Sequence, residues 1–211
     1  MVLLSCLSSN GVSAGELRAL VRDKSGNGVA DAVVVAQPVG AAPLVPAASA
    51  TMIVDQVNKE FIPYVLPVVV GTPVNFPNHD NIRHHVYSFS SAKPFELPLY
   101  TGTPAEPVLF DKPGVVILGC NIHDWMIGYV YVSESPYFAR TGPDGKAVIA
   151  DLPAGDYTVR AWHPRLEGRE EAGERKLAVG RSGISEAVWD IALLPDMRIR
   201  RAPIPGQSGY R

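Results

Sequence analysis

One short stretch of the sequence carries three side chains that bind soft transition metals. Cys120, His123 and Met126 follow one another at intervals of three residues, in a loop between two strand-like runs. A thiolate, two imidazoles and a weak axial thioether are the ligands of copper sites that transfer electrons. The pattern therefore predicts a copper site that takes three ligands from one loop and needs one further histidine.

A segment earlier in the chain supplies candidates for that histidine. Residues 78–89 contain the sequence Asn-His-Asp-Asn-Ile-Arg-His-His-Val-Tyr-Ser-Phe and lead into a strand-like run. We interpret His79 as structural and Asp80 as a turn residue rather than a ligand, because Asp favours turns. His84 and His85 remain as the two candidates.

Taken together, these residues resemble the cupredoxins. In those small β-sandwich proteins one histidine follows an asparagine-bearing loop, and cysteine, histidine and methionine lie near the end of the domain. The resemblance covers residues 51–133, and the loop spacing is most similar to the plastocyanin/amicyanin-like branch, which implies a methylamine-utilization-type protein. Carried over residue by residue, it implies one type 1 copper ion with four ligands: His84, Cys120, His123 and Met126.

The choice between His84 and His85 depends on which family position each matches. His84 is preferred because the family's His-Asn-Val is here His-His-Val, and because Asn78 stands six residues earlier. Phe89, four residues after His85, would instead favour His85. The family's asparagine beside the first ligand is thus replaced by His85, which either ties to Asn121 in the other ligand loop or competes for the metal.

The C-terminal half carries a second set of β-sandwich motifs. After a Gly-Pro-Asp-Gly turn, residues 152–159 contain Leu-Pro-Ala-Gly-Asp-Tyr-Thr-Val, which resembles the carboxypeptidase-regulatory-like or transthyretin-like sandwich. We expect residues 16–38 and 137–194 to form this small Ig/transthyretin-like sandwich, with the cupredoxin domain, residues 51–135, inserted into it. The alternative is an N-terminal hairpin that pairs with the cupredoxin, followed by a separate C-terminal domain.

Composition predicts an all-β fold, and the two resemblances imply that it consists of a cupredoxin Greek-key β-sandwich and a second small sandwich. The 19 glycines and 19 prolines among 211 residues favour turns over long helices. A net charge of −2 without an aromatic-rich basic patch gives no indication of nucleic acid binding. No stretch approaches the ~20 apolar residues of a membrane span. We expect residues 91–111, which contain four prolines, to be irregular, and residues 196–211 to be disordered.

The N-terminus predicts export to the periplasm. Residues 1–14 resemble the end of a secretory signal with a cleavage site near Ala14. Removing them leaves Cys120 as the only cysteine, because the other is Cys6. An unpaired cysteine in an oxidising compartment invites oxidation unless its sulfur is occupied, and metal ligation occupies it.

These features predict a periplasmic blue copper protein that carries single electrons between redox partners such as a cytochrome or a dehydrogenase. The sequence contains no Ser/His/Asp arrangement or phosphate-binding loop, so we do not expect an enzyme. Two alternatives stay open. The same ligands would serve a Cu(I)-binding chaperone or storage protein, and a metal-free interaction module would keep Cys120 as an inert core residue.

Overall fold

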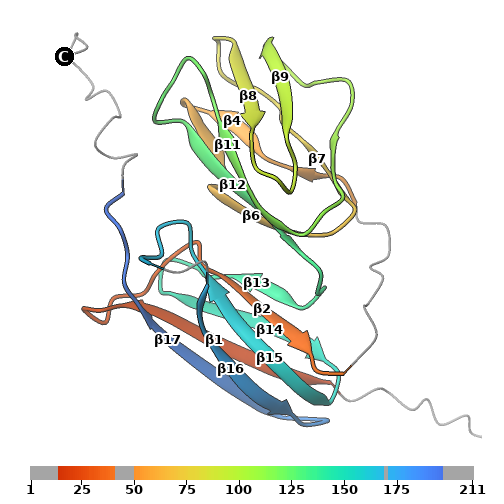
Figure 1. The fold of residues 1–211 in the computed structure, drawn as a ribbon, viewed down its shortest axis with the longest axis vertical. Coiled ribbons are helices and arrows are strands. Elements are labelled where there is room, and N and C mark those ends of the chain that lie inside the picture. Colours follow the sequence, from red (N-terminus) through yellow and green to blue (C-terminus); the bar gives the residue numbers. More distant parts are fainter. Residues whose placement is uncertain (1–13, 41–49, 169–170, 197–211) are drawn as a thin grey trace, which may run out of the picture.

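The described part of the chain is all-β, as the sequence predicts. The computed structural model describes residues 14–40, 50–168 and 171–196. These ranges form seventeen strands that build two sandwiches, one above the other in Figure 1. They contain no helix that could cross a lipid bilayer. Apart from Ala14 and Asp196, the predicted signal segment and C-terminal tail lie outside these ranges.

The upper sandwich in Figure 1 carries the candidate ligands, and we call it the site sandwich. Its main sheet has the strand order β6-β12-β11-β8-β9, and the other strands form a sheet in the order β10-β7-β3 and the hairpin β4-β5. In chain order its strands are β3 (Met52–Ile53), β4 (Asp55–Val57), β5 (Glu60–Ile62), β6 (Val65–Val69), β7 (Thr72–Asn75), β8 (His84–Ser88), β9 (Phe95–Tyr100), β10 (Val108–Phe110), β11 (Gly114–Gly119) and β12 (Ile127–Ser133).

The core of the site sandwich forms because apolar side chains alternate along its strands. On β11, Val116 and Leu118 are fully buried, whereas Ile117 between them is 47% exposed. Alternation of this kind places one face of a strand in the core. The same buried cluster includes Cys120 and Met126, which lie at the two ends of the loop after β11. Both candidate sulfur ligands are therefore part of the hydrophobic core.

The second sandwich consists of the sheets β14-β1-β17 and β13-β2-β15-β16. Strand β1 pairs antiparallel with β14 and parallel with β17, so distant parts of the chain share one sheet. The chain leaves for the site sandwich after β2 and returns at β13, and these strands are neighbours. The strands are β1 (Gly15–Asp23), β2 (Val33–Pro38), β13 (Phe138–Arg140), β14 (Lys146–Leu152), β15 (Gly155–Trp162), β16 (Ala172–Val179) and β17 (Ile184–Ile191).

Aromatic side chains pack where the two sandwiches meet. Trp162 of β15 is buried, and its ring centroid lies 5.8 Å from that of Tyr129 and 5.3 Å from that of Tyr131, both on β12. Val33 and Val65 belong to the same small cluster. Strand β12 therefore packs against the core of the site sandwich on one face and against the second sandwich on the other.

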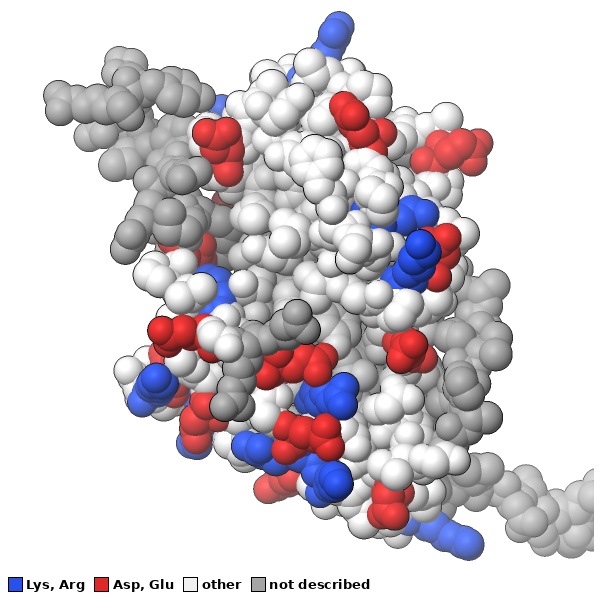
Figure 2. Space-filling view, in the orientation of Figure 1, with Lys and Arg blue, Asp and Glu red and all other residues white. Residues whose placement is uncertain are grey.

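Charged side chains are distributed unevenly over the face drawn in Figure 2. Lysine, arginine and acidic side chains lie interspersed over the second sandwich, whereas much of the site sandwich is uncharged. Mixed signs at close range leave little net field for a polyanion. This face therefore gives no indication of nucleic acid binding.

The prediction that residues 91–111 are irregular is wrong in part. This segment contains two strands, β9 and β10. Strand β9 pairs only with β8 and forms the edge of its sheet. Proline is tolerated in an edge strand because its missing N–H removes no ladder hydrogen bond there. Pro98 is thus compatible with β9, and the proline content misled the sequence-based interpretation.

Candidate metal centre

Strand pairing closes the loop that carries three of the candidate ligands. Gly119 at the end of β11 pairs with Ile127 at the start of β12. Inside the loop, the amide of Met126 donates a hydrogen bond of 2.9 Å to the carbonyl of His123. Cys120 continues the inward alternation of β11, so its side chain enters the core. The strand pair thus fixes both ends of the loop.

His84 begins strand β8, which lies beside β11, and a β-bulge in the neighbouring strand β9 lies next to it. Strand β8 pairs with β11 through Tyr87 opposite Gly119, and with β9 on its other side. The β8–β9 register shifts between His84 and Val86: His85 alone stands opposite Pro98 and Leu99, so the extra residue lies on β9. Bulges of this kind re-aim side chains and are common beside functional sites. The His84 side chain is completely buried.

The donor atoms of three candidate ligands converge. The Sγ atom of Cys120 lies 3.9 Å from Nδ1 of His84 and 3.8 Å from Nδ1 of His123. The potential ligand atoms of the three residues all lie within 4.8 Å of one another. The structure thus brings His84, and not His85, to the two loop residues.

The spacing of these atoms fits a shared metal ion. Bonds of ~2.0 Å to nitrogen and ~2.3 Å to sulfur, set at ~120°, hold the two donor atoms ~3.7 Å apart. The observed sulfur–nitrogen separations of 3.9 and 3.8 Å are close to that value. Two imidazoles with one thiolate also suit soft or borderline ions such as copper and zinc. The three residues therefore fit the metal that the sequence predicts.

A carboxylate fixes the protonation pattern of His84. Its Nε2 atom lies 2.7 Å from Oδ2 of Asp80, and the His84 side chain is fully buried whereas that of Asp80 is 13% exposed. An ionised carboxylate only accepts hydrogen bonds, so Nε2 must carry the proton and donate it. In the neutral ring Nδ1 then keeps its lone pair, which points toward Cys120. Hydrogen bonds of this type orient histidine ligands in metal sites.

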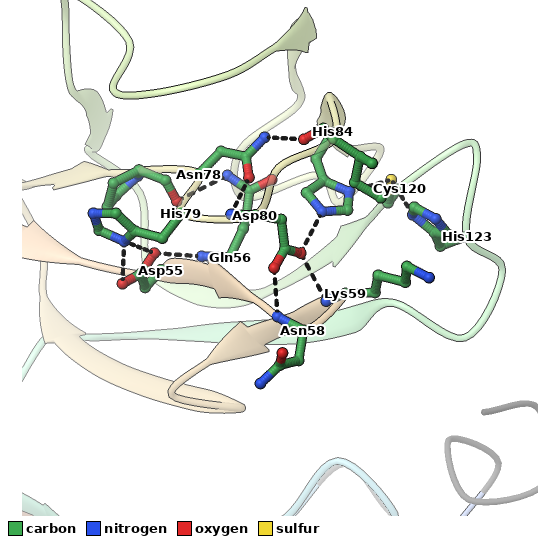
Figure 3. A network of polar contacts seen from close by, with 12 residues as sticks. Asp55, Gln56, Asn58, Lys59, Asn78, His79, Asp80, His84, Cys120 and His123 are labelled. Carbon is green, nitrogen blue, oxygen red and sulfur yellow. Dashed lines mark hydrogen bonds and ion pairs between the residues drawn. The ribbon is translucent and has the colours of Figure 1, made fainter. Parts of the chain in front are cut away.

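Asp80 is held in its ionised form by its surroundings (Figure 3). Partial burial alone would raise the pKa of its carboxyl group. Hydrogen bonds from His84 and from the backbone amides of Lys59 and Asn58 outweigh burial and lower that pKa below its ordinary value. The sequence-based interpretation of Asp80 as a turn residue missed this contact. The spacing Asp-x-x-x-His before a strand was the available signal.

His123 is the most exposed of the three clustered residues, although it is still only 9% exposed. Burial lowers the pKa of its imidazole, electrostatic interactions with His84 and Lys59 lower it further, and the negative charge of Asp80 opposes them in part. The ring is consequently neutral at pH 7 and has a lone pair for a metal ion. It packs beside Trp125, with ring centroids 5.2 Å apart.

The other predicted site residues lie around this cluster. Met126 is buried and lines a cavity together with Cys120 and the exposed Asn121. Its role as axial ligand stays a prediction. His85 is also buried, but its Nε2 atom bonds to Oε1 of Glu96 at 2.8 Å. The His85 side chain therefore bonds to a residue of β9, and not to Asn121 as expected.

No protein-family model matches the sequence, and no curated protein matches it. Among solved structures, the chain is similar to a copper-containing nitrite reductase from Thermus scotoductus SA-01, with 32% identity over 46% of this chain and a TM-score of 0.37. The match covers 25% of that enzyme, so this chain spans only about a quarter of the enzyme's length. A purple cupredoxin from Nitrosopumilus maritimus matches with 27% identity over 40% of this chain and 100% of its own, with a TM-score of 0.35. An amicyanin variant in the Cu(I) state matches with 21% identity over 39% of this chain and 82% of its own, with a TM-score of 0.36.

Proposed function

We propose that this protein is a type 1 copper protein that carries single electrons between redox partners. The observation that supports this most strongly is the convergence of Cys120 Sγ with Nδ1 of His84 and of His123 at one end of a β-sandwich core. These three residues would hold the ion, and Met126 would supply a weak axial sulfur. Bound copper supplies a one-electron couple between Cu(I) and Cu(II).

The β-sandwich contributes rigidity to this chemistry. Cys120 and His123 are fixed by the β11–β12 pair, and His84 is fixed by β8 and by its bond to Asp80. Trigonal ligation suits both oxidation states of copper, so ligands that hardly move allow fast electron transfer. Close packing of the surrounding core resists such movement.

The least buried of the clustered ligands marks the route for electrons in our proposal. His123 is more exposed than His84 and Cys120, and the neighbouring Ile122 is 44% exposed. A small contact surface suits the brief docking of redox proteins. We propose a cytochrome or a dehydrogenase as the partner, and electron carriage rather than catalysis as the role of this chain.

We further propose that the protein works in the periplasm. The signal-like residues 1–14 and the single cysteine that remains after their removal support this location. Cys120 is free of any disulfide and buried. Cell fractionation of the full chain, with N-terminal sequencing of the mature protein, tests the proposal. A cytoplasmic protein that keeps Met1 would contradict it.

The decisive experiment is the absorption spectrum of the purified protein with Cu(II). We expect an intense thiolate-to-copper band near ~600 nm that is absent from Cys120→Ser. In the unprocessed full chain, Cys6→Ser is the matched control and should retain the band. Binding of Cu(I) without this band would favour storage or delivery of copper. If neither oxidation state binds, the proposed function is wrong and the interaction-module alternative stands.

A further inference from the structure

The Asp80 carboxylate has more than one partner. Oδ2 accepts hydrogen bonds from Nε2 of His84 at 2.7 Å and from the amide of Lys59 at 2.8 Å, and Oδ1 accepts one from the amide of Asn58 at 2.6 Å. Three donors from two separate segments therefore meet at one carboxylate (Figure 3). A side chain used only to form its own turn would bond within that turn.

Asp80 is itself held in place by a buried asparagine. The amide of Asp80 donates to Oδ1 of Asn78 at 3.0 Å. The Nδ2 atom of Asn78 donates in turn to the carbonyls of Ile82 and Tyr100, at 2.9 and 2.8 Å. Asn78 is 3% exposed, so water hardly competes for these bonds. Asn78 consequently fixes the backbone of Asp80, while the three hydrogen bonds to its carboxylate hold the side chain toward His84.

The turn bonded to Asp80 has an unusual composition. Asn58 and Lys59 join β4 to β5, and both have positive φ angles, 55° and 62°. A two-residue hairpin turn of this type strongly favours glycine at its second position. Lysine at that position is strained, and such strain points to a role for the side chain. In Figure 3 the Lys59 side chain extends along the edge of the site on the side of His123.

We propose that Asp80 is a positioning residue that joins the copper ligand His84 to the β4–β5 turn, and thereby sets both the affinity of the site for Cu(II) and its reduction potential. This inference rests on the proposed function. The carboxylate makes the imidazole a stronger donor and places a negative charge behind it, and both effects favour Cu(II). Lys59 places a positive charge on the opposite edge, which favours Cu(I).

The test is a comparison of Asp80→Asn with wild type and with Asp55→Asn. The control removes a carboxylate from β4 that bonds to the exposed His79 and to no clustered ligand. Loss of a partner of a metal-bound histidine typically lowers metal affinity about 10–100-fold. A tenfold loss confined to Cu(II) raises the reduction potential by about 59 mV. We expect this rise in Asp80→Asn, a potential equal to wild type in Asp55→Asn, and a lower potential in Lys59→Gly.

The outcomes separate this inference from the proposed function. If the wild-type protein lacks the thiolate-to-copper band, the proposed function is refuted. If the wild-type protein shows the band, and Asp80→Asn has the same Cu(II) affinity and the same reduction potential as wild type, only the inference is refuted. Should Asp80→Asn fail to fold, nitrogen NMR of the metal-free wild-type protein decides, because no metal ion then dictates which nitrogen of His84 is protonated. A proton on Nε2 of His84 supports the role of Asp80, and a proton on Nδ1 overturns it.

Discussion

Gly119 permits a close contact immediately before the ligand loop, and adding one methyl group there should disturb both stability and the site. An ideal Cβ atom at this position would lie 2.8 Å from Cζ, 2.9 Å from Oη and 3.2 Å from Cε1 of Tyr87. Carbon atoms in favourable contact lie ~3.5–4.0 Å apart, so the Tyr87 ring would have to move by about 0.7 Å or more. That ring also contacts Phe89, with centroids 5.0 Å apart.

Overpacking of a core typically costs about 1–3 kcal/mol, and we expect about 1–2 kcal/mol here because the atoms that must move are the far end of the half-buried Tyr87 side chain. We therefore expect Gly119→Ala to lower the free energy of unfolding of the metal-free protein by about that amount, measured by urea denaturation. Gly142→Ala is the matched control, because its Cβ would meet nothing closer than 3.4 Å. We also expect Gly119→Ala to shift the thiolate-to-copper band, since Cys120 is the next residue.

A double-mutant cycle provides the sharpest test of this explanation. In a Tyr87→Ala background the clash is absent. The loss of unfolding free energy caused by Gly119→Ala should therefore be smaller there by at least about 1 kcal/mol. Equal costs of Gly119→Ala in the two backgrounds would refute the reasoning. The β11–β12 strand pair itself, and not the tyrosine ring, would then require glycine.

Three further predictions follow from the same structure. His84→Gln should abolish the thiolate-to-copper band and His85→Gln should retain it; the reverse result would make His85 the ligand. Burial raises the pKa of Tyr100 from 10.0 to about 12, so the unfolded state loses this proton first and the free energy of unfolding falls between about pH 10 and pH 12. The difference in unfolding free energy between wild type and Tyr100→Phe, measured in urea, should therefore become smaller over this range. A difference that does not change with pH would contradict this prediction. Copper at about 100 times its Kd should raise the free energy of unfolding by about 2.7 kcal/mol in calorimetry, and an equal gain in Cys120→Ser would show that Cu(II) binds elsewhere.

The part of the site that could be predicted is the part encoded locally. Cys120, His123 and Met126 lie on one loop, so their spacing in the sequence is close to their spacing in space. His84 could be predicted only through a family pattern, because its approach to the loop depends on pairing between β8 and β11. The structure brings three of these four donors together, whereas the axial role of Met126 stays a prediction.

The features that sequence analysis missed depend on contacts between distant segments. Asp80 resembles an ordinary turn residue until the β4–β5 turn, about 20 residues earlier, is brought beside it. The partner of His85 is Glu96, which lies on a strand that the prolines concealed. The strand pairings of the second sandwich are observed, while the independence of the two sandwiches as folding domains stays a proposal.

The insertion of one sandwich into the other has a consequence for the order of folding. Val35 on β2 pairs opposite Phe138 on β13, across about 100 residues of intervening chain. Closing a loop of that length costs about 3 kcal/mol more than closing a four-residue hairpin. Once the site sandwich has folded, the points where the chain enters and leaves it are fixed in space, so the effective length of this loop is shorter. We therefore expect refolding to form the site sandwich first, and rapid-mixing experiments should show fluorescence from Trp125 recovering before that from Trp189, which lies in the other core.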